Sequence, residues 1–240
     1  MLLNMINLER KKKRNILLSI SYKLQKLIFL PPQKKLKLFL NLSWIFSRLA
    51  HEQIIKNKMQ LPNSEEDDFL LNHIEYNANV LDIGCGEGYV EERLILKTKN
   101  IVGIDYNIHS LEIAKNKFKN SPSIQFYCMD VFKYLDENIN EKVDVIILSH
   151  ILEHLDNPAK FLMNLTEKAK YFYIEVPDFE ANHLNLYRQV LSCDLIYTDA
   201  DHVTEFDRKS LERIIANTGF TILNQEFRLG VMKYWCSHSK

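Results

Sequence analysis

Apolar positions along this chain repeat with two different spacings. From about residue 79 onward, short continuous apolar runs alternate with segments in which apolar residues return every three or four positions. The runs predict strands near 79–84, 100–105, 123–128, 143–148, 171–176, 220–225 and 231–236. The periodic segments predict helices near 87–98, 108–119, 157–168 and 207–217. This alternation is typical of an α/β fold with a mainly parallel sheet and helices on both faces.

The last two predicted strands are connected differently from the others. Residues 223–234 leave no room for a helix between them, so the chain must return in a hairpin. We therefore expect the final strand to run antiparallel to its neighbours.

The first 68 residues predict a basic helical extension that precedes a domain over 69–240. Pro31 and Pro32 should separate two amphipathic helices, the second beginning near Gln33. One face of the first helix carries Leu17, Ile20, Leu24 and Leu27, and one face of the second carries Leu38, Leu42, Ile45 and Leu49. Residues 57–68 form a polar connector, and a short helix near 69–74 leads into the first strand.

Charge is distributed unevenly between these two parts, although the net charge is zero. Residues 1–51 contain 11 Lys and Arg but one acid, Glu9, which leaves 20 basic and 30 acidic residues for the remainder. Such asymmetry suggests an anionic partner for the extension, or an extension that docks on its own acidic body. The functional interpretation is a basic interfacial helix at a membrane, followed by a second helix that covers the functional site as a lid. The structural alternative is an apolar stripe that packs on the core, with solvated lysines opposite.

The composition indicates the size of the core and the cellular compartment to expect. With 46% hydrophobic residues in 240, the chain can fill one sizeable core. The four cysteines lie far apart without a C-x-x-C pair, which fits a reducing cytoplasm. The apolar stretch 16–30 is interrupted by Lys23, Gln25 and Lys26 and is not followed by a small-residue cleavage site, so a signal peptide is disfavoured. It is also too short and too charged to span a bilayer. We expect a cytoplasmic protein, with contact at the inner membrane face as an open possibility.

The chemistry centres on the segment that follows the first predicted strand. Three of the six glycines stand at 84, 86 and 88, in the pattern D-x-G-x-G-x-G that begins at Asp82. Neither the phosphate-binding loop ending in Gly-Lys-Ser/Thr nor the dinucleotide pattern G-x-G-x-x-G is matched. Asp105 ends the second strand 21 residues after Gly84, where an acid can accept hydrogen bonds from ribose hydroxyls. The sequence therefore predicts a ribose-containing ligand.

These blocks, in this order over residues 79–236, resemble the class I S-adenosylmethionine (SAM) dependent methyltransferases. The resemblance implies a Rossmann-like sheet of order 3-2-1-4-5-7-6. It also implies that the glycine loop passes under the methionine part of SAM, that Asp105 holds the ribose and that residues after the third strand meet the adenine. The residues expected to bind SAM, and its product S-adenosylhomocysteine, are Asp82, Gly84, Cys85, Gly86, Asp105, Tyr106, Asp130, Val131 and Ser149.

Catalytic candidates follow the fourth strand, because ligands of such folds bind beyond the carboxyl ends of the strands. Methyl transfer to a hydroxyl needs a group that takes the proton, and histidine suits this role near neutral pH. We expect His154 to be the base, with His150 near the acceptor; the alternative is a histidine that only packs in this turn. His150, Glu153 and His154 also match the zinc motif H-x-x-E-H, but their place directly after a buried strand favours no metal.

Residues 177–203 form the expected acceptor loop, since connections of this length are usually functional. Its polar and aromatic candidates are His183, Tyr187, Arg188, Tyr197, Asp201 and His202. We expect His202 to be a base or an acceptor contact, and Tyr187 and Arg188 to bind the acceptor. The segment from His202 to Phe220 resembles the tail of methyltransferases in sugar and surface-glycan pathways.

The resulting hypothesis is a SAM-dependent methyltransferase acting on a small or carrier-bound acceptor, such as an oxygen of a sugar or polysaccharide precursor. The alternatives are N- or C-methylation of another metabolite or a lipid, and a SAM-binding module without catalysis. A nucleic-acid acceptor is disfavoured, because Ser149 and His150 stand where an Asn/Asp-Pro-Pro-aromatic motif would be expected.

Overall fold

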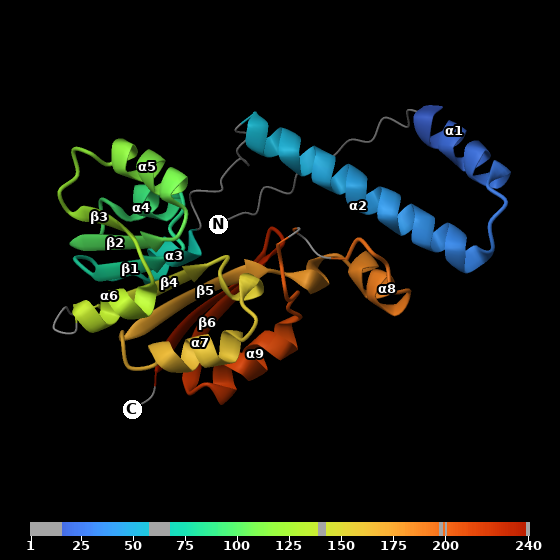
Figure 1. Ribbon diagram of the computed structural model, residues 1–240. Helices are drawn as coiled ribbons and strands as arrows, with labels where there is room; N and C mark the ends of the chain where they lie inside the picture. The colour runs from blue at the N-terminus through green and yellow to red at the C-terminus, as the bar shows by residue number, and fades with distance from the viewer. Residues whose placement is uncertain (1–15, 58–67, 139–142, 197–198, 200, 239–240) are drawn as a thin grey trace, which may run out of the picture.

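A seven-stranded sheet forms the centre of the molecule in a computed structural model that describes residues 16–57, 68–138, 143–196, 199 and 201–238 (Figure 1). The strands are β1 (Asn79–Ile83), β2 (Asn100–Asp105), β3 (Ile124–Cys128), β4 (Val145–Ser149), β5 (Tyr171–Pro177), β6 (Phe220–Arg228) and β7 (Val231–His238). Their order is β3-β2-β1-β4-β5-β7-β6. The predicted order is confirmed.

The antiparallel return is confirmed as well. The first five strands pair in parallel, whereas β7 runs antiparallel to both β5 and β6. Leu229 and Gly230 connect β6 to β7 and both have positive φ, 56° and 83°. Two such residues build the tight turn whose twist matches that of the flanking strands.

Helices cover both faces of the sheet and bury a separate core on each. One core packs α6 (Val131–Glu137), α7 (Pro158–Leu165) and α9 (Arg208–Asn217) against the sheet. The other packs α3 (Phe69–His73), α4 (Tyr89–Leu94) and α5 (Ile108–Lys117). Strand β4 shows why its sequence is continuously apolar: Ile146 and Leu148 enter the first core, and Val145 and Ile147 enter the second.

Three sequence-based assignments need correction. The helix predicted from residue 87 begins only at Tyr89, because Gly88 has φ 78° and cannot continue a right-handed helix. Helix α6 was not predicted, although Asp130 caps it by accepting hydrogen bonds from the Phe132 and Lys133 amides. The expected acceptor loop 177–203 contains a short 3-10 turn, η3 (Phe179–Ala181), and helix α8 (Leu184–Val190).

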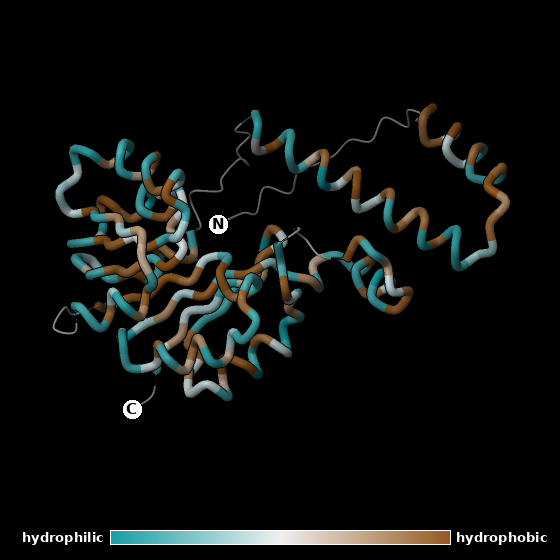
Figure 2. The backbone as a smooth tube through the Cα atoms, in the orientation of Figure 1, coloured by the Kyte–Doolittle hydropathy of each residue, from teal (hydrophilic) through white to brown (hydrophobic). Residues whose placement is uncertain are grey.

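The N-terminal extension consists of α1 (Ile16–Leu24), the 3-10 turn η1 (Gln25–Leu27) and the long helix α2 (Pro32–Lys56). Helix α1 buries none of its residues, and Figure 2 shows that it is largely hydrophobic. Helix α2 docks on the body beside α8: Leu40 is buried, and Lys37 Nζ donates to the Ser192 carbonyl at 2.8 Å. Most of the predicted polar connector, 58–67, lies outside the described residues.

Candidate functional site

The glycine loop leaves β1 with the backbone geometry that its sequence requires. Gly84, Gly86 and Gly88 all have positive φ, between 52° and 78°. A Cβ on Gly84 would clash with the Ile151 side chain at 2.0 Å, so this glycine allows close packing of the loop. A Cβ on Gly86 would instead enter open space, with no protein atom within 4 Å. The surface at Gly86 is therefore free for a ligand to approach the backbone closely.

Asp105 holds this loop in place. Its Oδ2 accepts the Gly86 amide at 2.8 Å, and its Oδ1 accepts the Asn107 amide at 2.7 Å. The bonds link the carboxyl ends of β1 and β2 through one carboxylate. A carboxylate has lone pairs for further donors, so Asp105 can still accept from ribose hydroxyls beside the loop.

Two further expected cofactor residues face each other across the next part of this edge. Tyr106 is exposed, and its hydroxyl donates to Asp130 Oδ2 at 2.6 Å. This bond, together with the amides at the start of α6, lowers the pKa of Asp130 and keeps it ionised. The pKa of Tyr106 is raised to about 12, first by the same hydrogen bond, so it remains a donor. Val131, in contrast, is buried in the core and offers its backbone rather than its side chain.

Asp82 does not face the ligand side, because it is buried against Glu91 of α4. Their exposed fractions are 1% and 0%, and three of their four oxygens accept no hydrogen bond within the described part of the chain. Burial raises the pKa of both carboxyls, that of Glu91 to about 7, and the neighbouring Glu91 raises the pKa of Asp82 further. Cys85, within the loop, is buried as well, and burial raises the pKa of its thiol. These three residues support the loop from below.

The turn after β4 is built around a charged histidine. His150 has φ 55°, which is unusual for a residue with a side chain, and its two ring nitrogens lie 3.0 Å from Glu153 Oε1 and 3.2 Å from Glu175 Oε1. Although burial opposes the charged form, hydrogen bonds to the two carboxylates raise the pKa of His150 to about 10. His150 is therefore an imidazolium at neutral pH and cannot serve as a base there.

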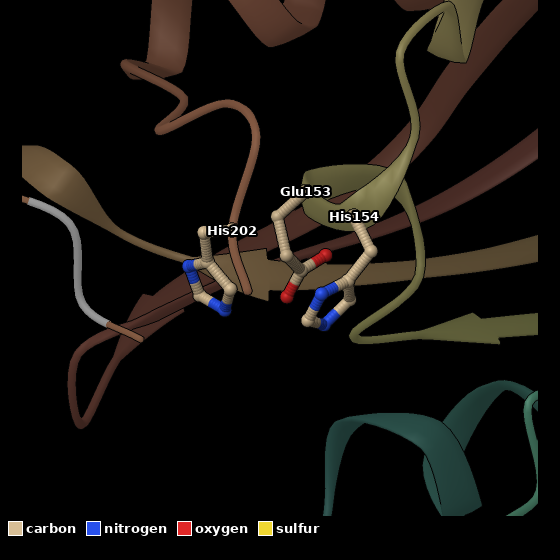
Figure 3. A group of neighbouring side chains, drawn as sticks. All are labelled: Glu153, His154 and His202. Atoms are coloured by element: carbon tan, nitrogen blue, oxygen red, sulfur yellow. The ribbon is translucent and has the colours of Figure 1, made fainter. Parts of the chain in front are cut away.

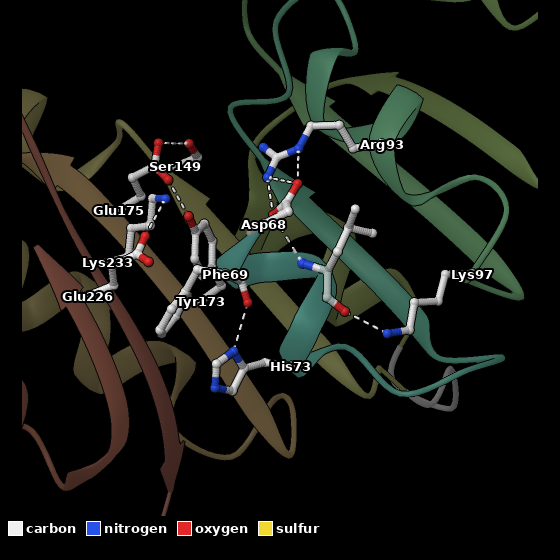
Figure 4. A network of polar contacts seen from close by, with 11 residues as sticks. Asp68, Phe69, His73, Arg93, Lys97, Ser149, Tyr173, Glu175, Glu226 and Lys233 are labelled. Atoms are coloured by element: carbon white, nitrogen blue, oxygen red, sulfur yellow. Dashed lines mark hydrogen bonds and ion pairs between the residues drawn. The ribbon is translucent and has the colours of Figure 1, made fainter. Parts of the chain in front are cut away.

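Glu175, near the end of β5, also interacts with Tyr173 and Ser149 (Figure 4). The Tyr173 hydroxyl donates to its Oε2, and Ser149 Oγ lies 3.5 Å from its Oε1. Burial favours the neutral acid, but the hydrogen bonds from His150 and Tyr173 outweigh it and lower the pKa of Glu175. Ser149, expected near the cofactor, is thus oriented by a carboxylate on the neighbouring strand.

His154 and His202, the two candidate bases, come together from segments far apart in the sequence (Figure 3). Their rings meet edge to face with centroids 4.8 Å apart. The backbone holds the two segments side by side, because the Val203 and Thr204 amides both donate to the Glu153 carbonyl, at 2.9 and 3.1 Å. His202 Nδ1 lies 3.0 Å from Glu205 Oε1, so a neutral His202 would donate there and leave Nε2 as an acceptor.

The same cluster contains atoms that suit a metal ion. Glu153, His154 and His202 can each offer one ligand atom, all within 4.8 Å of one another, and Glu153 Oε2 is buried without a partner. The Glu205 contact to His202 is the kind that orients a metal-bound imidazole. Against a metal stands His150, whose positive charge already neutralises Glu153 at 3.0 Å. The expectation of no metal stays a prediction.

A cavity of about 510 Å³ lies next to these histidines, between the body and α2. His150 and His202 line it from the sheet edge, and Trp44, Arg48 and His51 line it from α2. Arg48 is fixed there by an ion pair with Asp199 at 3.2 Å. Helix α2 therefore forms a wall of the cavity, as expected of a lid.

The two expected acceptor-binding residues of α8 differ in their surroundings. Arg188 lines the cavity but is 1% exposed; it donates to Asn185 Oδ1 at 2.6 Å and to the Leu40 carbonyl of α2 at 3.2 Å. It thus joins α8 to α2 rather than standing free for an acceptor. Tyr187 is exposed and is not among the residues that line the cavity. Tyr197 lies outside the described residues.

Sequence reasoning missed Glu91, Tyr173 and Glu175. No pattern in the sequence indicated that Glu91 of α4 is buried, as the structure shows. Glu175 lies near the end of a strand that was predicted, so its place close to the carboxyl edge of the sheet was a usable signal. The contribution of α2 to the cavity had a weaker signal, because Trp44 and Arg48 lie off the apolar face of the predicted helix.

Comparison with known proteins gives consistent results. Residues 55–225 match the family model described as a methyltransferase domain. A mitochondrial ubiquinone biosynthesis O-methyltransferase of Candida albicans is 29% identical over 116 residues, which cover 46% of this chain and 34% of that protein. The chain spans only about a third to a half of the length of the curated relatives it matches most strongly.

Solved structures show the same fold. A SAM-dependent methyltransferase from Clostridium acetobutylicum superposes with a TM-score of 0.57 at 15% identity, covering 82% of this chain and 100% of that one. A SAM-dependent methyltransferase from Archaeoglobus fulgidus has a TM-score of 0.53 at 25% identity, covering 66% and 67%.

Proposed function

The chain belongs to the methyltransferase-domain family, and on that basis we propose that it is a SAM-dependent methyltransferase acting on an oxygen of a small or carrier-bound acceptor. The observation that carries the proposal is the open backbone at Gly86 beside Asp105, together with a cavity that His150, directly after β4, and His202 line. SAM supplies the methyl group as a sulfonium. Gly84, Gly86, Asp105, Tyr106 and Asp130 fit a ligand that combines an amino acid, a ribose and an adenine.

The residues of the chain contribute mainly position and exclusion of water. In-line transfer needs the acceptor oxygen and the methyl group held in alignment, and a lid formed by α2 would close the cavity around them. His202 Nε2 is the better placed base, because Glu205 orients the ring through Nδ1. His154 contacts His202 and Asp201, and it can share or pass on the proton. His150 remains charged and stabilises negative charge that develops nearby.

The identity of the acceptor is the less supported part of the proposal. A sugar or polysaccharide precursor was expected from the tail that begins at His202, and the curated relatives do not support it. They include ubiquinone biosynthesis O-methyltransferases, which favours other small-molecule O-methylation. Two acceptor classes are therefore to be compared: hydroxyl-bearing precursors of ubiquinone, which the relatives favour, and carrier-bound sugars, which only the sequence of the tail favours. N- or C-methylation and a module without catalysis are weaker alternatives, because His202, which is suited to proton transfer, lines the cavity and His154 contacts it.

The experiment is a radiolabelled methyl-transfer assay with both acceptor classes, run on the full chain and on His202→Gln. A base role predicts that one class becomes labelled by the parent chain and that the variant binds SAM normally but transfers roughly 100-fold more slowly or worse. Leu96→Gln is the matched control, since Leu96 is 94% exposed and distant from the cavity lining. SAM binding by the parent chain without transfer to any acceptor would argue for the non-catalytic module.

We also propose that the protein is cytoplasmic and that its N-terminal extension contacts a membrane. This contact would bring the cavity close to acceptors carried in a bilayer.

A further inference from the structure

The outer surface of the N-terminal helices is far more apolar than the surface of a soluble monomer. Within α1, Ile16 and Leu17 are 72% and 76% exposed, and no residue of the helix is buried. Phe29, in the bend that follows, is 91% exposed. The same character continues along α2, where the exposed apolar side chains include Leu36, Phe39, Leu42, Ile45, Phe46 and Leu49. Figure 2 shows α1 and this bend as a mainly hydrophobic arm that extends away from the sheet. Surfaces of this size mark an interaction site.

The charges on this arm identify the kind of partner. Residues 10–51 contain eleven Lys and Arg and no Asp or Glu. Lys23, Lys26 and Lys34 are exposed on the described part of it, beside the apolar side chains. The rest of the chain carries the compensating excess of acids. A surface that combines exposed leucines and phenylalanine with lysines alone is complementary to an apolar layer bordered by negative charge.

The acidic body of the protein does not provide that partner for α1. Helix α2 does dock on the body, through Leu40, Lys37 and Arg48, so the alternative of an internally docked extension holds for α2. In contrast, α1 leaves its leucines in solvent. Among the described residues, no helix is both long and apolar enough to cross a bilayer. The nine residues of α1 extend only about 14 Å, against a hydrocarbon core of about 30 Å.

We infer that α1, the bend through Phe29 and the outer face of α2 form a docking surface for a bilayer of anionic phospholipids. The helix lies in the interfacial plane, with its leucines among the acyl chains and Lys23 and Lys26 at the headgroups. Helix α2 continues from this surface to the cavity that it lines with Trp44 and His51. Docking therefore brings α2, one wall of the cavity, to the membrane surface. The docking itself does not depend on the proposed methyl transfer.

Vesicle co-sedimentation of the full chain tests the inference. Vesicles of phosphatidylcholine mixed with phosphatidylglycerol should bind the protein, and pure phosphatidylcholine vesicles should bind it much more weakly. Replacing Lys23 and Lys26 by Gln should weaken binding to the mixed vesicles roughly 30-fold, because each cation near such a surface contributes about a factor of five. A double change of Leu17→Glu and Leu24→Glu should reduce binding by more than about tenfold.

The matched control is Leu96→Glu, which places the same kind of change on a leucine of the body that is even more exposed, and it should leave vesicle binding intact. Calorimetric SAM affinity should be the same in the parent chain and all three variants, which separates this test from the proposed function. The inference is overturned by equal binding to both vesicle types or by no binding to either. It is also overturned if light scattering finds a dimer that Leu17→Glu with Leu24→Glu dissociates, because the surface would then be covered by a second copy.

Discussion

Removal of the Asp105 carboxylate provides a sharp test of the cofactor site. The group accepts the Gly86 amide at 2.8 Å and the Asn107 amide at 2.7 Å, and we expect it also to accept from ribose hydroxyls. Hydrogen bonds to a charged acceptor are worth about 1.5 to 3 kcal/mol each. Because the two backbone bonds exist in the free protein, their loss lowers stability, whereas loss of the ribose contact lowers affinity.

We expect Asp105→Ala to weaken SAM binding by about 1 to 3 kcal/mol, or roughly 5- to 150-fold. Isothermal titration calorimetry measures this, and thermal unfolding measures the accompanying fall in stability. Asp136→Asn is the control, because Asp136 is an exposed carboxylate on α6 outside the site. Asp105→Asn keeps the size of the side chain and provides a second reading if the alanine variant unfolds. Unchanged affinity in a folded Asp105 variant would remove this residue from the site and refute the argument.

Three further predictions concern the buried and paired ionisable groups. His154→Ala and His202→Ala should leave SAM affinity nearly intact while lowering turnover, roughly 100-fold or more for whichever residue is the base. If activity is instead lost on chelation and restored by a divalent cation, the cluster of Glu153, His154 and His202 is a metal site. The raised pKa of His150 stabilises the folded protein fully below its unfolded pKa of about 6.5, and that contribution is lost as pH rises through about 10. His150→Gln should therefore lower the thermal midpoint at neutral pH by an amount that shrinks above about pH 10, and a constant difference across a pH series would contradict the ion-pair assignment. The pKa of Glu91 is raised to about 7, so the folded protein holds a proton that the unfolded chain releases, and stability falls between about pH 4.5 and 7. Glu91→Gln should flatten that fall and raise the thermal midpoint at pH 7. An unchanged pH profile would show that Glu91 does not hold this proton in the folded protein.

The sheet could be predicted from the sequence because burial of a strand on one or both faces determines which of its positions are apolar. Val145 to Leu148 are apolar at every position since both faces of β4 are covered, and the glycine spacing identified the loop that follows β1. Helices α6 and α8 escaped prediction because seven residues carry little periodic signal, and tertiary contacts help to hold them. For α8 these contacts include the bond from Arg188 to Leu40, 148 residues away in the chain.

The candidate site was predictable in its location and less so in its roles. His154 and His202 follow elements whose ends meet at one edge of the sheet, so their meeting could be expected. The roles of His150 and Asp82 depend on neighbours that the sequence did not identify. Glu175 across the sheet turns His150 into a cation, and Glu91 beneath the loop turns Asp82 into a buried support. Contacts between residues on different strands or helices determine these roles, and a local sequence pattern does not predict such contacts.

Calorimetric titration of the purified full chain with SAM and with S-adenosylhomocysteine tests the central claim most directly. The account predicts saturable binding of both ligands at one site per chain, weakened by Asp105→Ala and unaffected by His202→Gln. Absence of binding to either ligand would contradict the methyltransferase assignment of this glycine loop, and the open backbone at Gly86 would then belong to another ribose-containing ligand.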